Sequence, residues 1–393
     1  MIDFELDETL QGVRDMLHWF AQEEVRPIAL QADRDHAFPD AFLRKVKEMG
    51  ISMGALSRAE DSQKRGHGAK TVNRIAVIAG EELAWGDGAF LLSIPGPGLG
   101  GPPIQFLGSA EQKERFFGVF SRDAEPRYGA YGLTEPGAGS DVAGIRTTCK
   151  RDGDSWILDG AKCFITNGGR AEWVVVFATS DVSKGREAHR AFVVEKGTPG
   201  FRVGKIEKKL GLRASETAEL ILEGCRVPDA NVLGASDKAQ GFMGAMKTFD
   251  STRPMVAAMA VGIGRAAVER AGDHCKAAGT FRAGMKGALL ADALATAMRK
   301  LEVARLLCWR AAWMADEGMP NAREASMSKA YAAQAALEAC AASVQAMGVA
   351  GCAGDSLVEK WFRDIKVFDI FEGTGQIQRI VISKRLLEGL KSF

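Results

Sequence analysis

A single carboxylate near the C-terminal end of the sequence has the surroundings of a catalytic base. Glu372 follows two apolar residues, Ile370 and Phe371, and precedes a turn-forming stretch in which Gly373 and Gly375 flank a threonine. Aromatic and glycine neighbours can exclude water from a carboxylate, which raises its pKa toward neutral pH and suits it to general-base chemistry. Gly373 also lets a substrate approach the backbone closely. The same pattern is compatible with an ordinary helix N-terminus, where an acidic side chain suits the helix dipole.

Two upstream stretches have the composition of a site that holds an anion or a flat ring. Residues 131–141 contain three glycines, a proline and several hydroxyl groups. Backbone N–H groups of such a loop can form an anion-binding nest, with Ser140 as a further donor. About thirty residues later, Phe164 and Thr166 alternate at what reads as the end of a strand. Without further information, ordinary loops remain an alternative for both stretches.

A third stretch matches a nucleotide-binding pattern but does not predict a nucleotide site. Residues 96–101 place glycines in the GxGxxG arrangement directly after the apolar run 89–92. Four nearby prolines crowd the place where the required helix would begin, and no βαβ repeat surrounds the stretch. We therefore expect a close crossing of helices and a loop here.

The elements that must position these residues fall into three parts. Residues 1–120 have helical periodicity, residues 121–233 contain short β-rich runs separated by turn signals, and residues 234–393 are helical and rich in alanine. Long helices with many small residues suit a tightly packed bundle. The fold class predicted is α+β, mostly α, with an N-terminal helical domain (1–120), a middle antiparallel β domain (121–233) and a C-terminal helical bundle domain (234–393).

Composition narrows the class of protein. The chain has 393 residues, of which 46% are hydrophobic, and a net charge of +1, so nothing draws it to nucleic acid or an anionic membrane. Its seven cysteines form no CxxC pair, which favours reduced thiols over a disulfide framework or a metal site. The acidic N-terminus is unlike a targeting segment, and we expect a cytoplasmic protein.

Four stretches together resemble the acyl-CoA dehydrogenase family: residues 131–141, 164–168, 249–254 and 371–379. They keep the family's order and approximate spacing, and the resemblance runs nearly end to end. It implies two helical domains around a β domain, with a C-terminal four-helix bundle, one FAD per subunit and usually a homotetramer made of two dimers. It further implies oxidation of an acyl-CoA thioester to a trans-2-enoyl-CoA, with an electron-transfer flavoprotein as electron acceptor.

The resemblance also implies a role for each matching residue. Glu372 would take the α-proton while the β-hydride passes to flavin N5, and the Glu372 backbone N–H would help to bind the thioester oxygen. Some members carry the base near Ser251 and Thr252, but neither of these residues is a carboxylate here. The implied FAD contacts are Tyr131, Leu133, Thr134, Gly139, Ser140, Phe164, Thr166, Thr374 and Gln376. The implied substrate contacts are Ser140, Asp250, Arg253 and Gly373; no metal is implied.

The chain departs from the family where members usually reach the FAD of a neighbouring subunit. Ala278 stands in place of an arginine, the glutamine that normally follows is missing, and Val349 replaces the second glycine of a Gln-x-x-Gly-Gly motif. Arg282 or Lys286 can replace the lost charge in a homotetramer. Alternatively, this catalytic chain pairs with a related non-catalytic chain in an α2β2 heterotetramer, as occurs for steroid side-chain substrates.

Other functions remain open at this stage. The chain can be a non-catalytic subunit, although the complete Glu372 motif argues against that interpretation. It can also be a related flavoenzyme that acts on acyl carrier protein or uses oxygen as acceptor. The sequence predicts neither the length nor the branching of the acyl group.

Overall fold

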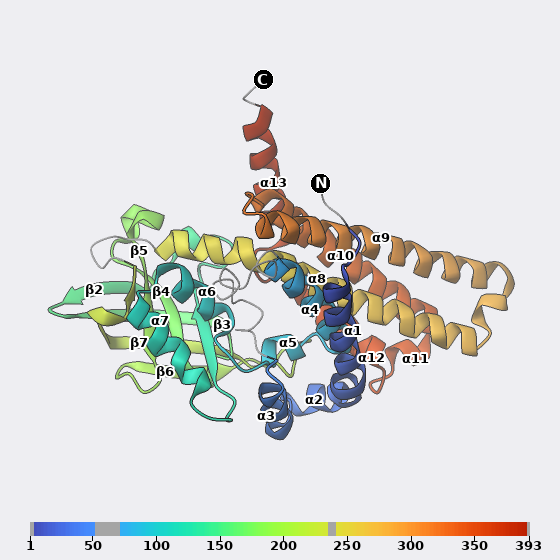
Figure 1. Cartoon of the computed structure of the whole chain (residues 1–393), viewed down its shortest axis with the longest axis horizontal. Coiled ribbons are helices and arrows are strands. Elements are labelled where there is room, and N and C mark those ends of the chain that lie inside the picture. Colours follow the sequence, from blue (N-terminus) through green and yellow to red (C-terminus); the bar gives the residue numbers. More distant parts are fainter. Residues whose placement is uncertain (1–3, 52–70, 235–240, 391–393) are drawn as a thin grey trace.

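The structure is a computed structural model, and it describes residues 4–51, 71–234 and 241–390. The N-terminal part contains α1 (Glu8–Phe20), α2 (Ala29–Asp35), α3 (Asp40–Glu48), α4 (Val72–Gly86), α5 (Phe90–Ser93), α6 (Gly101–Leu107) and α7 (Ala110–Gly118). The C-terminal part contains α8 (Gly241–Ala277), α9 (Gly284–Asp316), α10 (Ala322–Met347), α11 (Val349–Cys352), α12 (Leu357–Ile365) and α13 (Gly375–Leu390). The predicted order of helices, β domain and helices is confirmed (Figure 1). Within the described residues no helix is long and apolar enough to cross a membrane.

The N-terminal helices begin where the sequence offers capping groups. Asp7 precedes α1 and accepts a hydrogen bond from the backbone N–H of Leu10 at 2.8 Å. Ser109 and Gln112 form a capping box at the start of α7. On α1 the periodic residues Leu10 and Phe20 are buried, as the predicted apolar stripe requires.

The middle part is one sheet. Its strands are β1 (Tyr128–Gly132), β2 (Thr148–Asp152), β3 (Ser155–Thr166), β4 (Ala171–Thr179), β5 (His189–Glu195), β6 (Phe201–Ile206), β7 (Thr217–Pro228) and β8 (Val232–Leu233). The main path runs β6-β7-β3-β2-β4-β5-β8, and most of its pairs are antiparallel, as predicted. However, β1 pairs with β4 in parallel, which brings the chain from the N-terminal helices onto the sheet beside the buried strand β4.

The glycine pattern at residues 96–101 serves packing. A Cβ added at Gly100 would lie 2.5 Å from the carbonyl oxygen of Ala130 and 2.6 Å from the Trp173 ring. Gly96 exchanges backbone hydrogen bonds with Arg127 and Gly129 and forms a parallel bridge with Tyr128, so the loop runs alongside β1. The close approach expected here therefore exists, but it joins the loop to a strand and is not a crossing of helices and a loop.

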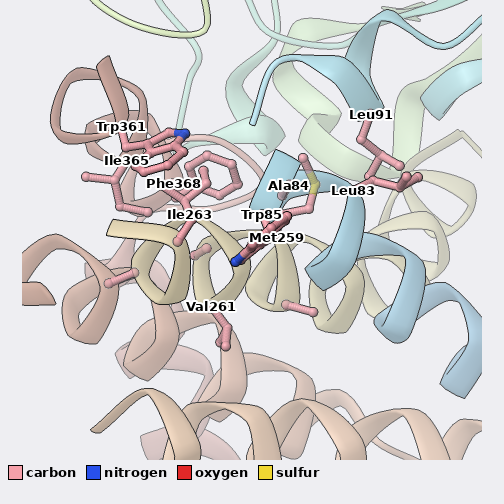
Figure 2. Close-up of a cluster of buried hydrophobic side chains, with 14 of the residues drawn as sticks. Leu83, Ala84, Trp85, Leu91, Met259, Val261, Ile263, Trp361, Ile365 and Phe368 are labelled. Atoms are coloured by element: carbon pink, nitrogen blue, oxygen red, sulfur yellow. The ribbon is translucent and has the colours of Figure 1, made fainter. Parts of the chain in front are cut away.

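Helix α8 connects the β domain to the C-terminal bundle. In Figure 1 this helix runs from beside the sheet into the layer formed by α9 and α10. It also packs on α4, and Gly262 permits this contact because a Cβ there would lie 2.1 Å from the Glu81 carbonyl oxygen. Figure 2 shows the apolar side chains that meet around α8, including Ile263, Trp85 and Trp361. Helices from both ends of the chain therefore share one core.

A buried charge cluster fixes the helical parts to the β domain. Lys360 of α12 contacts Asp87, the residue that ends α4, and donates to Asp364 Oδ2 at 2.5 Å. The second oxygen of Asp364 accepts a hydrogen bond from the backbone N–H of Leu212, which lies between β6 and β7, at 2.6 Å. Lys360, Asp87 and Asp364 are all completely buried. Burial raises the pKa of Asp87, and the two carboxylates raise the pKa of Lys360 against the opposing effect of burial.

Replacing Lys360 by methionine tests this cluster. The Lys360→Met change leaves two buried carboxylates without their cation, and we expect the free energy of unfolding to fall by about 3–5 kcal/mol. Urea denaturation of the full chain measures the effect, with Lys366→Met as a matched control because Lys366 is exposed on the next turn. Equal midpoints for the two variants would show that the cluster does not stabilise the fold.

Candidate active site

The turn that carries Glu372 has an uncommon backbone. Glu372 lies between the 3-10 turn Lys366–Asp369 and α13, with a φ of +54°, and Gly373 follows with a φ of +94°. A positive φ at a residue with a side chain costs on the order of 1–3 kcal/mol, so surrounding contacts must hold it. The buried amide of Gln378 supplies two such contacts, because its Nε2 donates to the carbonyl oxygens of Glu372 (3.1 Å) and Gly373 (3.0 Å).

The Glu372 carboxylate faces α8. Thr252 Oγ1 donates a hydrogen bond to Glu372 Oε2 at 2.7 Å. Pro254 lies inside the same helix, and a proline interrupts the helical hydrogen-bond ladder at this point. Burial raises the pKa of Glu372, while the Thr252 hydrogen bond and the charges of Arg253 and Lys329 oppose the rise without cancelling it. A carboxyl with a raised pKa that accepts a hydrogen bond from a neutral donor is suited to accept a proton.

Tyr131 connects β1 to this carboxylate. Its ring packs against Phe177, at 5.0 Å between centroids, and against Phe249 of α8, at 6.0 Å. The Tyr131 hydroxyl is buried, and burial raises its pKa, with a further contribution from the nearby Glu372. The guanidinium of Arg253 lies 5.6 Å from the Phe249 ring centre, so α8, β1 and the Glu372 turn converge here.

A buried ion pair fixes the loop that follows β1. Lys162 Nζ lies 2.6 Å from Glu135 Oε1 and also donates to the Leu133 carbonyl oxygen at 3.2 Å. Glu135 accepts two further hydrogen bonds from the backbone N–H groups of Arg146 and Thr147. Burial lowers the pKa of Lys162 to about 8. Burial alone would raise the pKa of Glu135, but the charge of Lys162 and the hydrogen bonds to Glu135 outweigh that effect and lower it. The loop is therefore rigidly joined to β3.

Phe164 occupies an irregular and open position at the end of β3. Its φ is +57°, the register between β3 and β7 shifts beside it, and its side chain is 64% exposed. The backbone N–H of Cys163 donates to the Thr134 carbonyl oxygen at 2.9 Å, so the loop after β1 lies directly alongside. Phe164 therefore leaves an aromatic face uncovered beside this loop.

The structure brings most of the predicted residues into two adjoining groups. The first contains Glu372, Gly373, Arg253 and Tyr131, and the second contains Leu133, Thr134, Phe164 and Thr166. Tyr131 of the first group and Thr134 of the second are three residues apart, so their Cα atoms lie within about 10 Å of each other.

The remaining predicted residues lie at the margins. Gly139 and Ser140 are exposed on the loop after β1. Thr374 accepts a hydrogen bond from the Ile377 N–H at 3.3 Å, and Gln376 is exposed on the first turn of α13. The side chain of Asp250 lies outside the described residues.

Sequence reasoning missed several residues that shape the site. It noted Thr252 only as a position without a carboxylate, and it did not identify Lys329, Gln378 or the Lys162–Glu135 pair. A signal exists for Lys329, since it is the one charged residue in the alanine-rich stretch 325–337 of α10. No sequence signal identifies the partner of Thr252, because Glu372 lies 120 residues away.

Replacing Lys162 tests how the loop is held. In Lys162→Met the Glu135 carboxylate stays buried without its cation, and we expect the loop to open more often. Hydrogen–deuterium exchange of residues 133–141 should accelerate at least tenfold, which corresponds to about 1.4 kcal/mol. Lys150→Met, at an exposed position of β2, is the control and should leave this exchange unchanged. Unchanged exchange in both variants would mean that other contacts fix the loop.

Comparison with known proteins identifies the family. Models of the acyl-CoA dehydrogenase N-terminal, middle and C-terminal domains match residues 7–121, 130–225 and 239–387. The mitochondrial short-chain specific acyl-CoA dehydrogenase of Mus musculus is 38% identical over 99% of this chain and 92% of its own length. The predicted domain boundaries stay predictions.

Solved structures of similar proteins agree with this family assignment. Butyryl-CoA dehydrogenase from Megasphaera elsdenii is 32% identical, with a TM-score of 0.87 over 98% of this chain and 100% of the other. A structure described as the electron transferring flavoprotein of Acidaminococcus fermentans is 36% identical, with a TM-score of 0.88 over 98% of this chain and 100% of that one.

The cofactor of this family is FAD, and the residues present fit it. Phe164 offers an uncovered aromatic face for a flat ring system, and the exposed loop containing Gly139 and Ser140 offers donors for a pyrophosphate. A Cβ at Gly139 would meet nothing within 4 Å, so the loop has room for a bound group. The predicted enzyme class and cofactor are thus confirmed: this chain belongs to the acyl-CoA dehydrogenase family of FAD-dependent oxidoreductases.

Proposed function

We propose that this enzyme oxidises short-chain acyl-CoA thioesters to trans-2-enoyl-CoA, with Glu372 as the base that removes the α-proton. The observation that carries the proposal is the half-buried Glu372 carboxylate, whose pKa is raised by burial and which accepts a 2.7 Å hydrogen bond from Thr252. The short-chain assignment is supported by the M. musculus and M. elsdenii relatives, which are named for short-chain and butyryl substrates.

The residues of the chain have distinct roles in this reaction. Glu372 acts as the ionised carboxylate, and its backbone N–H helps to bind the thioester oxygen, on which negative charge develops as the proton leaves. Arg253 lies beside the carboxylate and the CoA-binding end of α8, and Gly373 allows the substrate to pass close to the backbone. When bound, FAD supplies the two-electron oxidation by accepting a hydride.

The cofactor is proposed to lie between the two groups of residues described above. Phe164 and Thr166 cover one face of the ring, and Tyr131, Leu133 and Thr134 line its edge. Gly139 and Ser140 hold the pyrophosphate, or lie near the CoA arm. Thr374 and Gln376 contact FAD from the start of α13, and Asp250 is proposed to contact the CoA arm with Arg253.

The proposed electron acceptor is an electron-transferring flavoprotein, and the proposed assembly is a homotetramer. Cys275 Sγ lies 3.4 Å from the Ala346 carbonyl oxygen, which places the ends of α8 and α10 together. At this end Val349 is 90% exposed and Met285 is 77% exposed, an apolar surface suited to a neighbouring subunit.

The α2β2 alternative predicts that this chain alone does not retain FAD. The cytoplasmic location stays a prediction.

The first test is the anaerobic reduction of the bound flavin. Butyryl-CoA should bleach the visible flavin band faster than octanoyl-CoA or palmitoyl-CoA. Glu372→Gln should slow this reduction by about 10²–10⁴-fold, because that is the typical contribution of a general base. Glu388→Gln, at an exposed position of α13, is the control. Full activity of Glu372→Gln would exclude Glu372 as the base, and rapid oxygen consumption would indicate an oxidase.

The second test is the pH dependence of this reduction. The base works when ionised, so the rate should rise with pH through a pKa above the usual range of glutamate. We call this rising part of the pH–rate profile the acid limb. Thr252→Val removes a hydrogen bond to the ionised Glu372 carboxylate and should move the acid limb to higher pH by about one unit. An acid limb at the same pH in both proteins would exclude Thr252 from controlling the carboxylate.

A further inference from the structure

A buried lysine with no role in the proposed chemistry lies against the catalytic turn. Lys329 of α10 is 1% exposed, and its neighbours on the same helix face, Ala325, Ala332 and Ala333, are buried too. Lysine is almost never fully buried unless its charge has partners, so this position requires a reason. The contacts of Lys329 point to the Glu372 turn. Its Nζ donates to the Gly373 carbonyl oxygen at 3.1 Å and lies 5.9 Å from the centre of the Phe371 ring.

The hydrogen bond from Lys329 acts on the most strained part of the site. Gly373 follows Glu372, and both have a positive φ. The Gly373 carbonyl oxygen accepts from Gln378 of α13 at 3.0 Å as well as from Lys329 of α10. The turn is therefore held by two different helices. A catalytic group displaced by about 1 Å can lose 10²-fold in rate, so this restraint matters for the direction of the Glu372 side chain.

The charge of Lys329 acts on the carboxylate itself. The charged or titratable groups around Glu372 are Arg253 from α8, Lys329 from α10, Tyr131 from β1 and, on its own segment, Asp369, which interacts with Lys329. Tyr131 is neutral at pH 7, since its pKa is raised, so Arg253 and Lys329 oppose the desolvation of Glu372. Burial lowers the pKa of Lys329 to about 8, against the attraction of Glu372 and Asp369, and it remains mainly protonated at neutral pH.

We propose that Lys329 is a positioning residue for Glu372: its hydrogen bond to the Gly373 carbonyl holds the catalytic turn, and its positive charge keeps the Glu372 carboxylate ionised. This inference rests on the proposed role of Glu372 as the base. The alternative is a purely structural role, in which Lys329 only ties α10 to the start of α13. That role affects stability and FAD retention but does not move the pH dependence of the reaction.

Two substitutions separate the hydrogen bond from the charge. Lys329→Gln removes the charge and keeps a donor, whereas Lys329→Met removes both. Lys384→Gln, at an exposed position of α13, is the matched control. The experiment uses the FAD-loaded full chain with butyryl-CoA under anaerobic conditions, and records the rate of flavin reduction between pH 5.5 and 9. FAD content and thermal midpoint are measured for every variant.

The expected result has two parts. Both Lys329 variants should shift the acid limb to higher pH by about one unit or more, since loss of a nearby opposite charge disfavours the carboxylate. At pH 9 the rate of Lys329→Gln should stay within about threefold of the wild type, and that of Lys329→Met should fall about tenfold, because only the latter loses the restraint on the turn.

A probe that cannot complete the reaction gives an independent readout. A 3-thia acyl-CoA has sulfur in place of the β-carbon, so it can lose its α-proton but has no β-hydride to transfer. The pH dependence of its absorbance change with the bound flavin reports ionisation of the base, and it should shift in both Lys329 variants as the rate does.

Several outcomes would overturn the inference. An acid limb unmoved relative to Lys384→Gln assigns Lys329 a structural role, as does failure of both variants to fold or to hold FAD. An inactive Glu372→Gln together with unmoved limbs removes this inference alone. A fully active Glu372→Gln removes the proposed function itself.

Discussion

The position of the Glu372 turn depends on the buried cation of Lys360. Two carboxyl groups share this cation, and the cluster is stable only while all its partners are present. Asp87 ends α4, and Asp364 receives the backbone N–H of Leu212 from the β domain. These three contacts set α12 against the N-terminal helices and the sheet together. Glu372 follows α12 closely, so this cluster also helps to place the Glu372 turn relative to the β domain.

The environment of Glu372 is a balance between desolvation and compensation. A fully desolvated carboxylate without partners would stay protonated and could not act as a base, whereas one in a strong ion pair would be too weak a base. The structure surrounds Glu372 with a neutral donor, Thr252, and with the positive charges of Arg253 and Lys329. The result is a pKa that is raised but still opposed. Such a balance requires groups from separate helices, which explains why α8 and α10 both reach the same turn.

The sequence predicts the order of the elements well because helical and strand periodicities are local properties. It also predicts Glu372, Arg253 and Phe164 as site residues, since each lies in a short motif that resembles the family. It does not predict the contacts that hold the Glu372 turn, because Lys329 meets Gly373 across 44 residues of chain and Thr252 meets Glu372 across 120. The left-handed backbone at Phe164 and Glu372 was also not predictable, because tertiary contacts stabilise a conformation that both residue types disfavour.

The expected FAD environment has two halves, one within this chain and one that faces a neighbouring subunit, and the chain supplies suitable residues mainly for the first. The half within this chain is fixed by the Lys162–Glu135 pair and by the backbone bond between Cys163 and Thr134. The half that family members offer to a neighbour carries Ala278 and the exposed Val349, neither of which can bind a phosphate or a ring nitrogen through its side chain. We therefore propose that one chain carries the residues for the chemistry, and that retention of the cofactor depends on a neighbouring subunit, through residues such as Arg282 or Lys286 or through a different chain.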